Sequence, residues 1–227
     1  MTLLCHSGHM GTNGKLVDLR NLLAERFPHS PLEATARFRT GQPLIDSVIG
    51  NGLPKGAITE ISSPQLSAGS ASLIAGLVRA AGEARYFVAL IDGRDSFDPE
   101  PLGHACLRHL LWVRCHKAIE AVKAADLLLR DGNFSLVLLD LVLNFPNELR
   151  KIPQANWYRL QRLVEPTSTA FLVMSRRSMV ASARLKIVLE NRWTLETFKQ
   201  DNALSLARLQ VERSHLAQSV DPQAEAG

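Results

Sequence analysis

Short apolar segments alternate with helix-forming segments along most of the chain, and this order constrains the fold more than any other feature. Apolar runs at residues 57–61, 86–91, 110–113, 136–139, 170–174 and 185–189 predict strands. Helical spacing of apolar residues appears between several of them, at residues 70–81, 119–130 and 155–164. Short apolar strands separated by helices are typical of a mainly parallel sheet covered on both faces. The sequence therefore predicts an α/β sandwich. Residues 193–198 and 204–211 are candidates for further edge strands, and the second also fits a short helix.

The composition favours a single globular core in a reducing compartment. With 227 residues and 46% hydrophobic content, the chain can bury one substantial core. Its three cysteines show no C-x-x-C spacing, and no N-terminal stretch resembles a signal peptide, so we expect a cytoplasmic protein. No apolar run approaches the ~20 residues of a membrane helix. Cys5, His6 and His9 lie close together but lack a fourth ligand, so we expect no metal site.

Residues 60–73 have the outline of a strand, a phosphate loop and a helix, but they lack the lysine of such a loop. In the pattern G-x-x-x-x-G-K-[ST], backbone N–H groups surround the phosphates and the lysine neutralises their charge. Here Ser63 stands at the first glycine, Gly69 comes one residue late, and Ser70 and Ala71 replace the lysine and the hydroxyl residue. Taken alone, the stretch also fits an ordinary Ser/Gly loop that caps a helix.

Four blocks, in this order and spacing, resemble the ATPase core of the RecA family. They are TGQPLID at 40–46, GNGLPKGAITEI at 50–61, ALIDGRDSFDP at 89–99 and LVLLD at 136–140. The resemblance extends from about residue 16 to about residue 189 and implies a RecA-like three-layer α/β/α sandwich with a mainly parallel sheet. We accordingly expect a flexible N-terminus, helix and connector at 1–40, a RecA-like core domain at 41–213 and a disordered tail at 214–227.

Within the RecA-like proteins, the chain is most similar to the ImuA family of bacterial damage-induced mutagenesis. The similarity lies in LRNLLAERFP at 19–28, LPKGAITE at 53–60 and LLWVR at 110–114. It implies a non-catalytic adaptor in the SOS response that supports error-prone translesion synthesis. The implied partners are an ImuB-type Y-family polymerase homologue, an error-prone C-family DNA polymerase and RecA, in a cytoplasmic, nucleoid-associated setting.

Comparison with the RecA pattern indicates a second chemical loss, at Arg94. The catalytic glutamate that positions the attacking water in the family falls at this residue. A guanidinium stays protonated in proteins and cannot act as a general base. Asp95 is adjacent but would project in another direction, while Asp140 keeps the Walker B position. We therefore expect no hydrolysis and no cofactor, although weak nucleotide binding without turnover stays open.

The positive charge lies in the last third of the chain. Residues 148–213 contain 12 Lys and Arg against 6 Asp and Glu. RecA-like recombinases carry a long DNA-binding loop where this chain has only residues 175–183, so we expect no strand exchange. The candidate phosphate contacts are Arg176, Arg177, Arg184 and Lys186. Direct DNA contact stays open, because these residues also fit an ordinary solvated surface.

The N-terminal region contains a candidate partner-binding helix. Its apolar residues Leu19, Leu22, Leu23 and Phe27 follow helical spacing and end before Pro28. RecA-like recombinases carry the element that packs on a neighbouring subunit at this place, so the helix is a candidate docking element for RecA or for a second copy. A helix folded back on its own core is the alternative.

Two other functions compete with the adaptor hypothesis. A SulA-like cell-division inhibitor also has a reduced RecA-like fold without ATP, but such proteins are shorter and lack blocks like those at 40–46 and 53–56. A RecA-like ATPase with a reorganised phosphate loop is the second alternative. Filamentation on overexpression would support the inhibitor, and phosphate release from ATP would support the ATPase.

Overall fold

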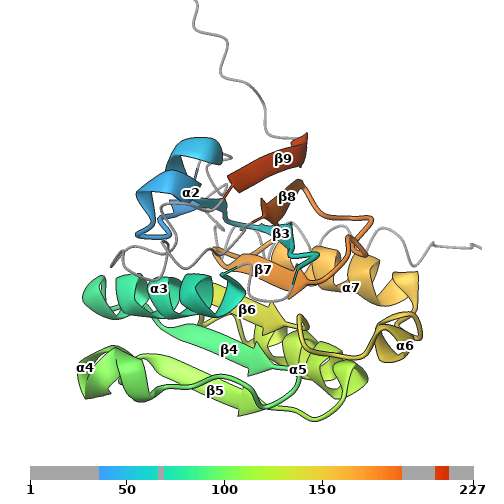
Figure 1. Cartoon of the computed structure of the whole chain (residues 1–227), viewed down its shortest axis with the longest axis horizontal. Helices are drawn as coiled ribbons and strands as arrows, with labels where there is room; N and C mark the ends of the chain where they lie inside the picture. The colour runs from blue at the N-terminus through green and yellow to red at the C-terminus, as the bar shows by residue number, and fades with distance from the viewer. Residues whose placement is uncertain (1–35, 66–68, 191–207, 215–227) are drawn as a thin grey trace, which may run out of the picture. The chain divides into compact units, whose positions relative to one another are not determined.

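The computed structural model describes residues 36–65, 69–190 and 208–214, which form a seven-stranded sheet with helices on both faces (Figure 1). The sheet order is β5-β4-β6-β7-β3-β8-β9. The strands are β3 (Ala57–Ser62), β4 (Val88–Asp92), β5 (Leu110–Arg114), β6 (Leu136–Asp140), β7 (Ala170–Ser175), β8 (Leu185–Glu190) and β9 (Arg208–Ser214). All neighbouring pairs are parallel except β8 and β9. The predicted mainly parallel α/β/α sandwich is therefore confirmed.

Helices connect the parallel strands and cover the two faces of the sheet. They are α3 (Ser70–Glu83), α4 (Gly103–Leu107), α5 (Ala118–Asp131), α6 (Pro146–Leu149) and α7 (Gln154–Val164), with a short 3₁₀ turn at Glu100–Leu102. Helix α3 packs on one face with α4, and α5 packs beside α7 on the other. Gly132, with φ of 70°, ends α5 in the left-handed conformation that glycine adopts without steric cost.

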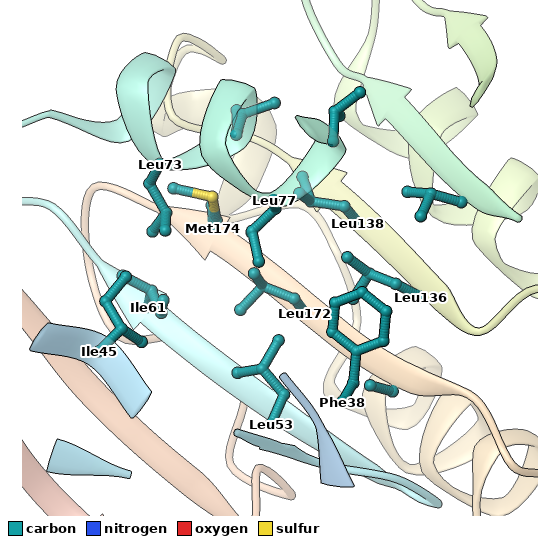
Figure 2. Close-up of a cluster of buried hydrophobic side chains, with 14 of the residues drawn as sticks. Phe38, Ile45, Leu53, Ile61, Leu73, Leu77, Leu136, Leu138, Leu172 and Met174 are labelled. Carbon is teal, nitrogen blue, oxygen red and sulfur yellow. The ribbon is translucent and has the colours of Figure 1, made fainter. Parts of the chain in front are cut away.

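Each face of the sheet has its own apolar core. The first core joins α3 to strands β4, β6, β7, β3 and β8, and Figure 2 shows Leu73 and Leu77 of α3 above Leu138, Leu172 and Met174. The second core lies under α5 and α7 and contains the fully buried Trp157. Strands that are covered on both sides need apolar residues at successive positions, which explains the continuous apolar runs in the sequence.

A small N-terminal addition extends the first core. Strand β1 (Arg37–Phe38) pairs antiparallel with β2 (Leu53–Pro54), and helix α2 (Pro43–Val48) lies between them in the chain. Phe38, Ile45 and Leu53 are each at most 3% exposed and point into the first core (Figure 2). Gly52 has φ of 131°, and a Cβ there would lie 2.4 Å from the Phe38 carbonyl oxygen. The close approach of these two backbone segments therefore requires glycine at residue 52.

The predicted elements compare closely with the observed ones, with three differences. Strand β4 starts at Val88, two residues later than expected, because the Tyr86 N–H bonds to Ala81 O and closes the end of α3. Residues 208–214 form a strand, so the strand alternative holds for the described part of the region predicted at 204–211. Helices α2, α4 and α6 and the β1–β2 pair were not predicted, since they are too short to show periodicity.

Some expectations lie outside the described residues. They are the N-terminal helix with Leu19, Leu22, Leu23 and Phe27, the cluster Cys5, His6 and His9, and the strand at 193–198. Within the described ranges, no helix has the length and apolar character needed to cross a membrane.

We predict that Leu77→Ala lowers the free energy of unfolding by about 2–5 kcal/mol, because it leaves a cavity between α3 and the sheet. Leu77 is 0% exposed, whereas Leu127 on α5 is 68% exposed. The matched control Leu127→Ala should change stability by less than about 0.5 kcal/mol. Urea unfolding of both variants checks this, and equal effects would contradict the described packing.

Candidate functional site

The candidate site lies at the carboxyl edge of the sheet, where the parallel strands end. The register aligns Arg114 of β5 with Asp92 of β4, and Asp92 with Asp140 of β6. Strand β3 ends at the same edge at Ser62, separated from β6 by β7, and residues 63–69 connect it to α3. In open α/β sheets ligands bind outside the carboxyl ends of the strands, so the chemistry available here decides what the site can do.

The start of the former phosphate loop is held by the sheet. Ser63 is 0% exposed, and its N–H donates to Ser175 O at 2.7 Å. Gly69, with φ of 99°, precedes α3, whose first residues are the half-buried Ser70 and the exposed Ala71. No lysine or arginine occurs among residues 63–65 and 69–73, which are the described parts of the loop and the first turn. These parts therefore supply no cation for a triphosphate.

Asp92 anchors the loop that follows β4. Its carboxylate is 1% exposed and accepts hydrogen bonds from the N–H groups of Arg94 (3.2 Å), Ser96 (2.7 Å) and Phe97 (2.8 Å). A buried carboxylate is stable only when such donors replace its hydration. The Asp92 carboxylate therefore stabilises the conformation of its own loop.

Arg94, at the position of the catalytic acid, points across the neighbouring loops. Its Nη1 donates to His116 O at 3.2 Å, and its guanidinium lies 4.5 Å from the centre of the Phe145 ring. Cation–π contacts of this kind contribute about 0.5–1 kcal/mol at exposed sites. The side chain thus joins the loops after β4, β5 and β6 and offers no base for a water molecule.

Asp95, the possible substitute for the missing acid, is engaged elsewhere. Both of its carboxylate oxygens pair with Arg114, with 2.6 Å between Oδ2 and Nη2. The hydrogen bond from Arg114 holds the pKa of Asp95 below its ordinary value. A carboxylate that is paired in this way and has a lowered pKa is a poor general base at neutral pH.

Asp140 occupies the Walker B position at the end of β6. Its Oδ1 accepts the Val142 N–H at 2.9 Å, so the carboxylate supports its own loop. Burial raises the pKa of Asp140 to about 6; the Val142 hydrogen bond opposes this rise, and the charge of Asp92 adds to it. Its ionised form is therefore costly in this environment.

The loops after β4 and β6 are locked to each other. The Gly93 N–H donates to Asp140 O at 2.9 Å, and Asn144 Nδ2 donates to Gly93 O at 2.9 Å. A Cβ on Gly93 would lie 2.2 Å from Asn144 Oδ1, which explains the glycine. Asn144 also donates to Glu148 at 3.2 Å. In the described residues, the polar groups of this edge are thus mostly used to hold loops together.

The basic candidates lie around the loop from β7 to β8, and one of them has a structural role. Lys186 is paired with Glu60 of β3, with 3.0 Å between Nζ and Oε2, and it donates to Ser178 Oγ at 2.7 Å. Glu60 is 1% exposed and also accepts the N–H groups of Met179 and Val180. The charge of Lys186 therefore compensates a buried carboxylate, and a phosphate contact of this residue stays a prediction.

The other three basic residues differ in exposure. Arg177 is exposed, whereas Arg176 and Arg184 are half-buried. The Nε of Arg176 is buried without a hydrogen-bond partner among the described residues. Arg177 is thus the member of the set with the most accessible charge, and direct DNA contact stays a prediction.

The described residues offer no metal centre. No group of three or more His, Cys, Asp and Glu side chains is placed to hold an ion in the described ranges. Asp92 and Asp140 form only a pair, and donors within their own loops already occupy them.

Part of the chain is similar to RecA proteins. It is 32% identical over 124 residues to Protein RecA of Streptomyces avermitilis, covering 53% of this chain and 31% of that protein. It is 35% identical over 107 residues to Protein RecA of Clavibacter michiganensis, covering 45% of this chain and 29% of that protein. It is 29% identical over 114 residues to Protein RecA of Xylella fastidiosa, covering 49% of this chain and 33% of that protein. The chain is RecA-like.

The similarity to RecA covers only part of this chain and only part of each RecA protein. The chain spans about a third of the length of these RecA proteins. No family model matches the chain. The sheet with its flanking helices is consistent with a RecA-like α/β fold.

The sequence analysis did not identify three residues of this region that contribute to the site. Glu60, Asn144 and Phe145 fix or cover the loops, yet only Glu60 lies within a recognised block. The available signal for Glu60 was a single charged residue inside a buried strand, because a buried carboxylate requires partners. Nothing in the sequence around Asn144 and Phe145 indicates which loop they contact.

We predict that Asp140→Asn stabilises the protein at pH 7.5. The native pKa of about 6 exceeds the ordinary value of 3.8, so the native state binds more protons between these values. Stability contributed by Asp140 is therefore full below pH 3.8 and is lost as pH rises through 6. Because asparagine carries no titratable proton, the Asp140→Asn variant should have a free energy of unfolding at pH 7.5 that is higher by on the order of 2 kcal/mol.

The control for this prediction is Asp92→Asn. Asp92 accepts three backbone N–H groups with both oxygens, so its amide should destabilise the protein. Urea unfolding at pH 4.5 and 7.5 separates the two variants. An Asp140→Asn protein that keeps the pH dependence of the wild type would contradict the assignment.

We predict that Glu60→Gln lowers the free energy of unfolding by about 3 kcal/mol, because it breaks a buried ion pair. Both carboxylate oxygens face donors, so either orientation of the amide places its NH₂ against an N–H, hydroxyl or ammonium group. Hydrogen exchange should also accelerate at the Met179 and Val180 amides. Glu190→Gln, at an exposed position at the end of β8, is the control, and equal stability of the two variants would refute the role of Glu60.

Proposed function

We propose that the chain is a non-hydrolysing RecA-like adaptor of the bacterial DNA-damage response that supports error-prone translesion synthesis. The observation that carries the proposal is the state of Arg94, which occupies the position of the catalytic acid and is bound to His116 O and the Phe145 ring. Phosphoryl transfer depends on positioning and charge neutralisation. Without the loop lysine and the water-positioning acid, little of that chemistry is left.

The neighbouring carboxylates support the same proposal. Asp95 is neutralised by Arg114, and Asp92 serves the N–H groups of its own loop. Asp140 keeps the Walker B position, but its raised pKa disfavours the ionised form that would hold Mg²⁺. A RecA-like ATPase with a reorganised loop would need these groups free, so this alternative has less support.

The proposed partners follow from the resemblance to the ImuA family. They are an ImuB-type Y-family polymerase homologue, an error-prone C-family DNA polymerase and RecA. Leu19, Leu22, Leu23 and Phe27 of the N-terminal helix are the proposed contacts with a partner. The protein would act near the nucleoid, with Arg177 and its basic neighbours as candidate contacts to DNA.

We expect deletion of the gene to abolish damage-induced mutation, and Ser70→Ala and Asp140→Ala to restore it fully when supplied on a plasmid. Leu22→Asp should fail to restore it, because it places a charge on the proposed docking face. Asn21→Asp, on the polar side of the same predicted helix, is the matched control. Mutation frequency after ultraviolet irradiation provides the measurement.

The competing functions predict different outcomes of the same experiments. Phosphate release from ATP and Mg²⁺ by the purified protein, lost in Asp140→Ala, would establish the ATPase instead. Cell filamentation on overexpression, with normal mutation in the deletion strain, would establish the division inhibitor. A gene for a Y-family-like polymerase beside this one would favour the adaptor.

A further inference from the structure

A groove between α5 and α7 lies on the face of the sheet opposite α3. Its cavity volume is about 530 Å³, and α5 and α7 provide most of its lining, with Pro153 at the start of α7. Along α5 the lining residues Ile119, Lys123, Asp126 and Leu127 recur at three- and four-residue spacing, which places them on one side of the helix. The lining of the groove includes none of the residues that hold Arg94 and Asp95, and it does not depend on nucleotide chemistry.

The floor of the groove is apolar and its rim exposes large apolar side chains. Val122 and Leu160 are 4% and 1% exposed and form the floor. Ile119 and Leu127 on the rim are 39% and 68% exposed. Such side chains above an apolar floor leave a surface that gains free energy when a partner covers it.

The charged groups around the groove are predominantly positive. Asp126 accepts from Arg130 of α5 and from Arg159 of α7, each at 2.9 Å, so one carboxylate serves two guanidinium groups. Lys123 is exposed and has no hydrogen bond or ion pair to another residue that the structure describes. One guanidinium charge and the Lys123 ammonium are therefore left without a matching carboxylate at the rim.

The dimensions of the groove fit one short helix. Helices α5 and α7 have 14 and 11 residues, which corresponds to lengths of ~21 and ~16 Å at 1.5 Å per residue. A helix of about three turns would cover the apolar floor along its whole length. Helix-in-groove recognition uses apolar anchors at i, i+3, i+4 and i+7, which match such a floor.

We propose that the α5–α7 groove is a docking site for an acidic amphipathic helix of a partner protein. The apolar face of that helix covers Val122, Leu160, Ile119 and Leu127, and its flanking carboxylates pair with Lys123 and Arg159. The proposal names a partner class for the adaptor and in that respect rests on the proposed function, but the binding itself is independent of DNA damage or ATP.

Selection from a displayed library of randomised helical peptides on the full-length protein tests this directly. Selected peptides should carry apolar residues at i, i+3/i+4 and i+7 with flanking Asp and Glu. Leu127→Asp and Lys123→Glu should each weaken binding of a selected peptide by about tenfold, equal to about 1.4 kcal/mol. Phe87→Asp and Lys117→Glu, at exposed positions outside the groove, are the matched controls and should bind as the wild type does.

Three outcomes would overturn the proposal. The first is that the library yields no peptides whose binding depends on Leu127. The second is that the selected peptides are basic or non-helical. The third is that analytical ultracentrifugation detects a dimer that Leu127→Asp abolishes, which would assign the groove to a second copy. Normal peptide binding with no effect of Leu127→Asp on damage-induced mutation would separate the groove from the proposed adaptor function.

Discussion

The structure depends on the burial of a parallel sheet on both faces. Strands β4, β6, β7 and β3 are almost entirely covered by α3 on one side and by α5 and α7 on the other. Because the strands are parallel, their carboxyl ends meet at one edge, and the polar residues at the strand ends gather there. This constraint places Asp92 next to Asp140 and puts Ser62 on the same edge beyond β7, whether or not the chain uses them for chemistry.

Contacts within the chain occupy most of the polar groups at this edge. Asp92 holds three N–H groups, Asn144 spans two loops, and Arg94 lies on Phe145. These contacts give the edge a closed network in which each described loop is fixed by its neighbour. Arg94 thus has intramolecular partners, and Ser70 supplies no cation, which supports the proposed role as an adaptor.

The sequence could predict the sheet because each apolar run is long enough to identify a buried strand. It could also predict the missing lysine and the cation at residue 94, since these depend only on position within a recognised motif. It could not predict the pairing of Lys186 with Glu60 or of Arg94 with Phe145, because the partners are distant in the chain and meet only through the sheet order. Lys186 illustrates the limit: the sequence shows a basic residue beside a strand end, whereas the structure adds a buried carboxylate 3.0 Å from its ammonium group.

Hydrogen–deuterium exchange with and without ATP and Mg²⁺, at concentrations that saturate RecA, tests the central claim most directly. If the carboxyl edge is closed by its own contacts, protection of residues 69–73, 93–97 and 141–145 will be the same in both samples. A marked increase in protection of these three segments with ATP and Mg²⁺ would show that the edge still binds nucleotide, and would contradict the account.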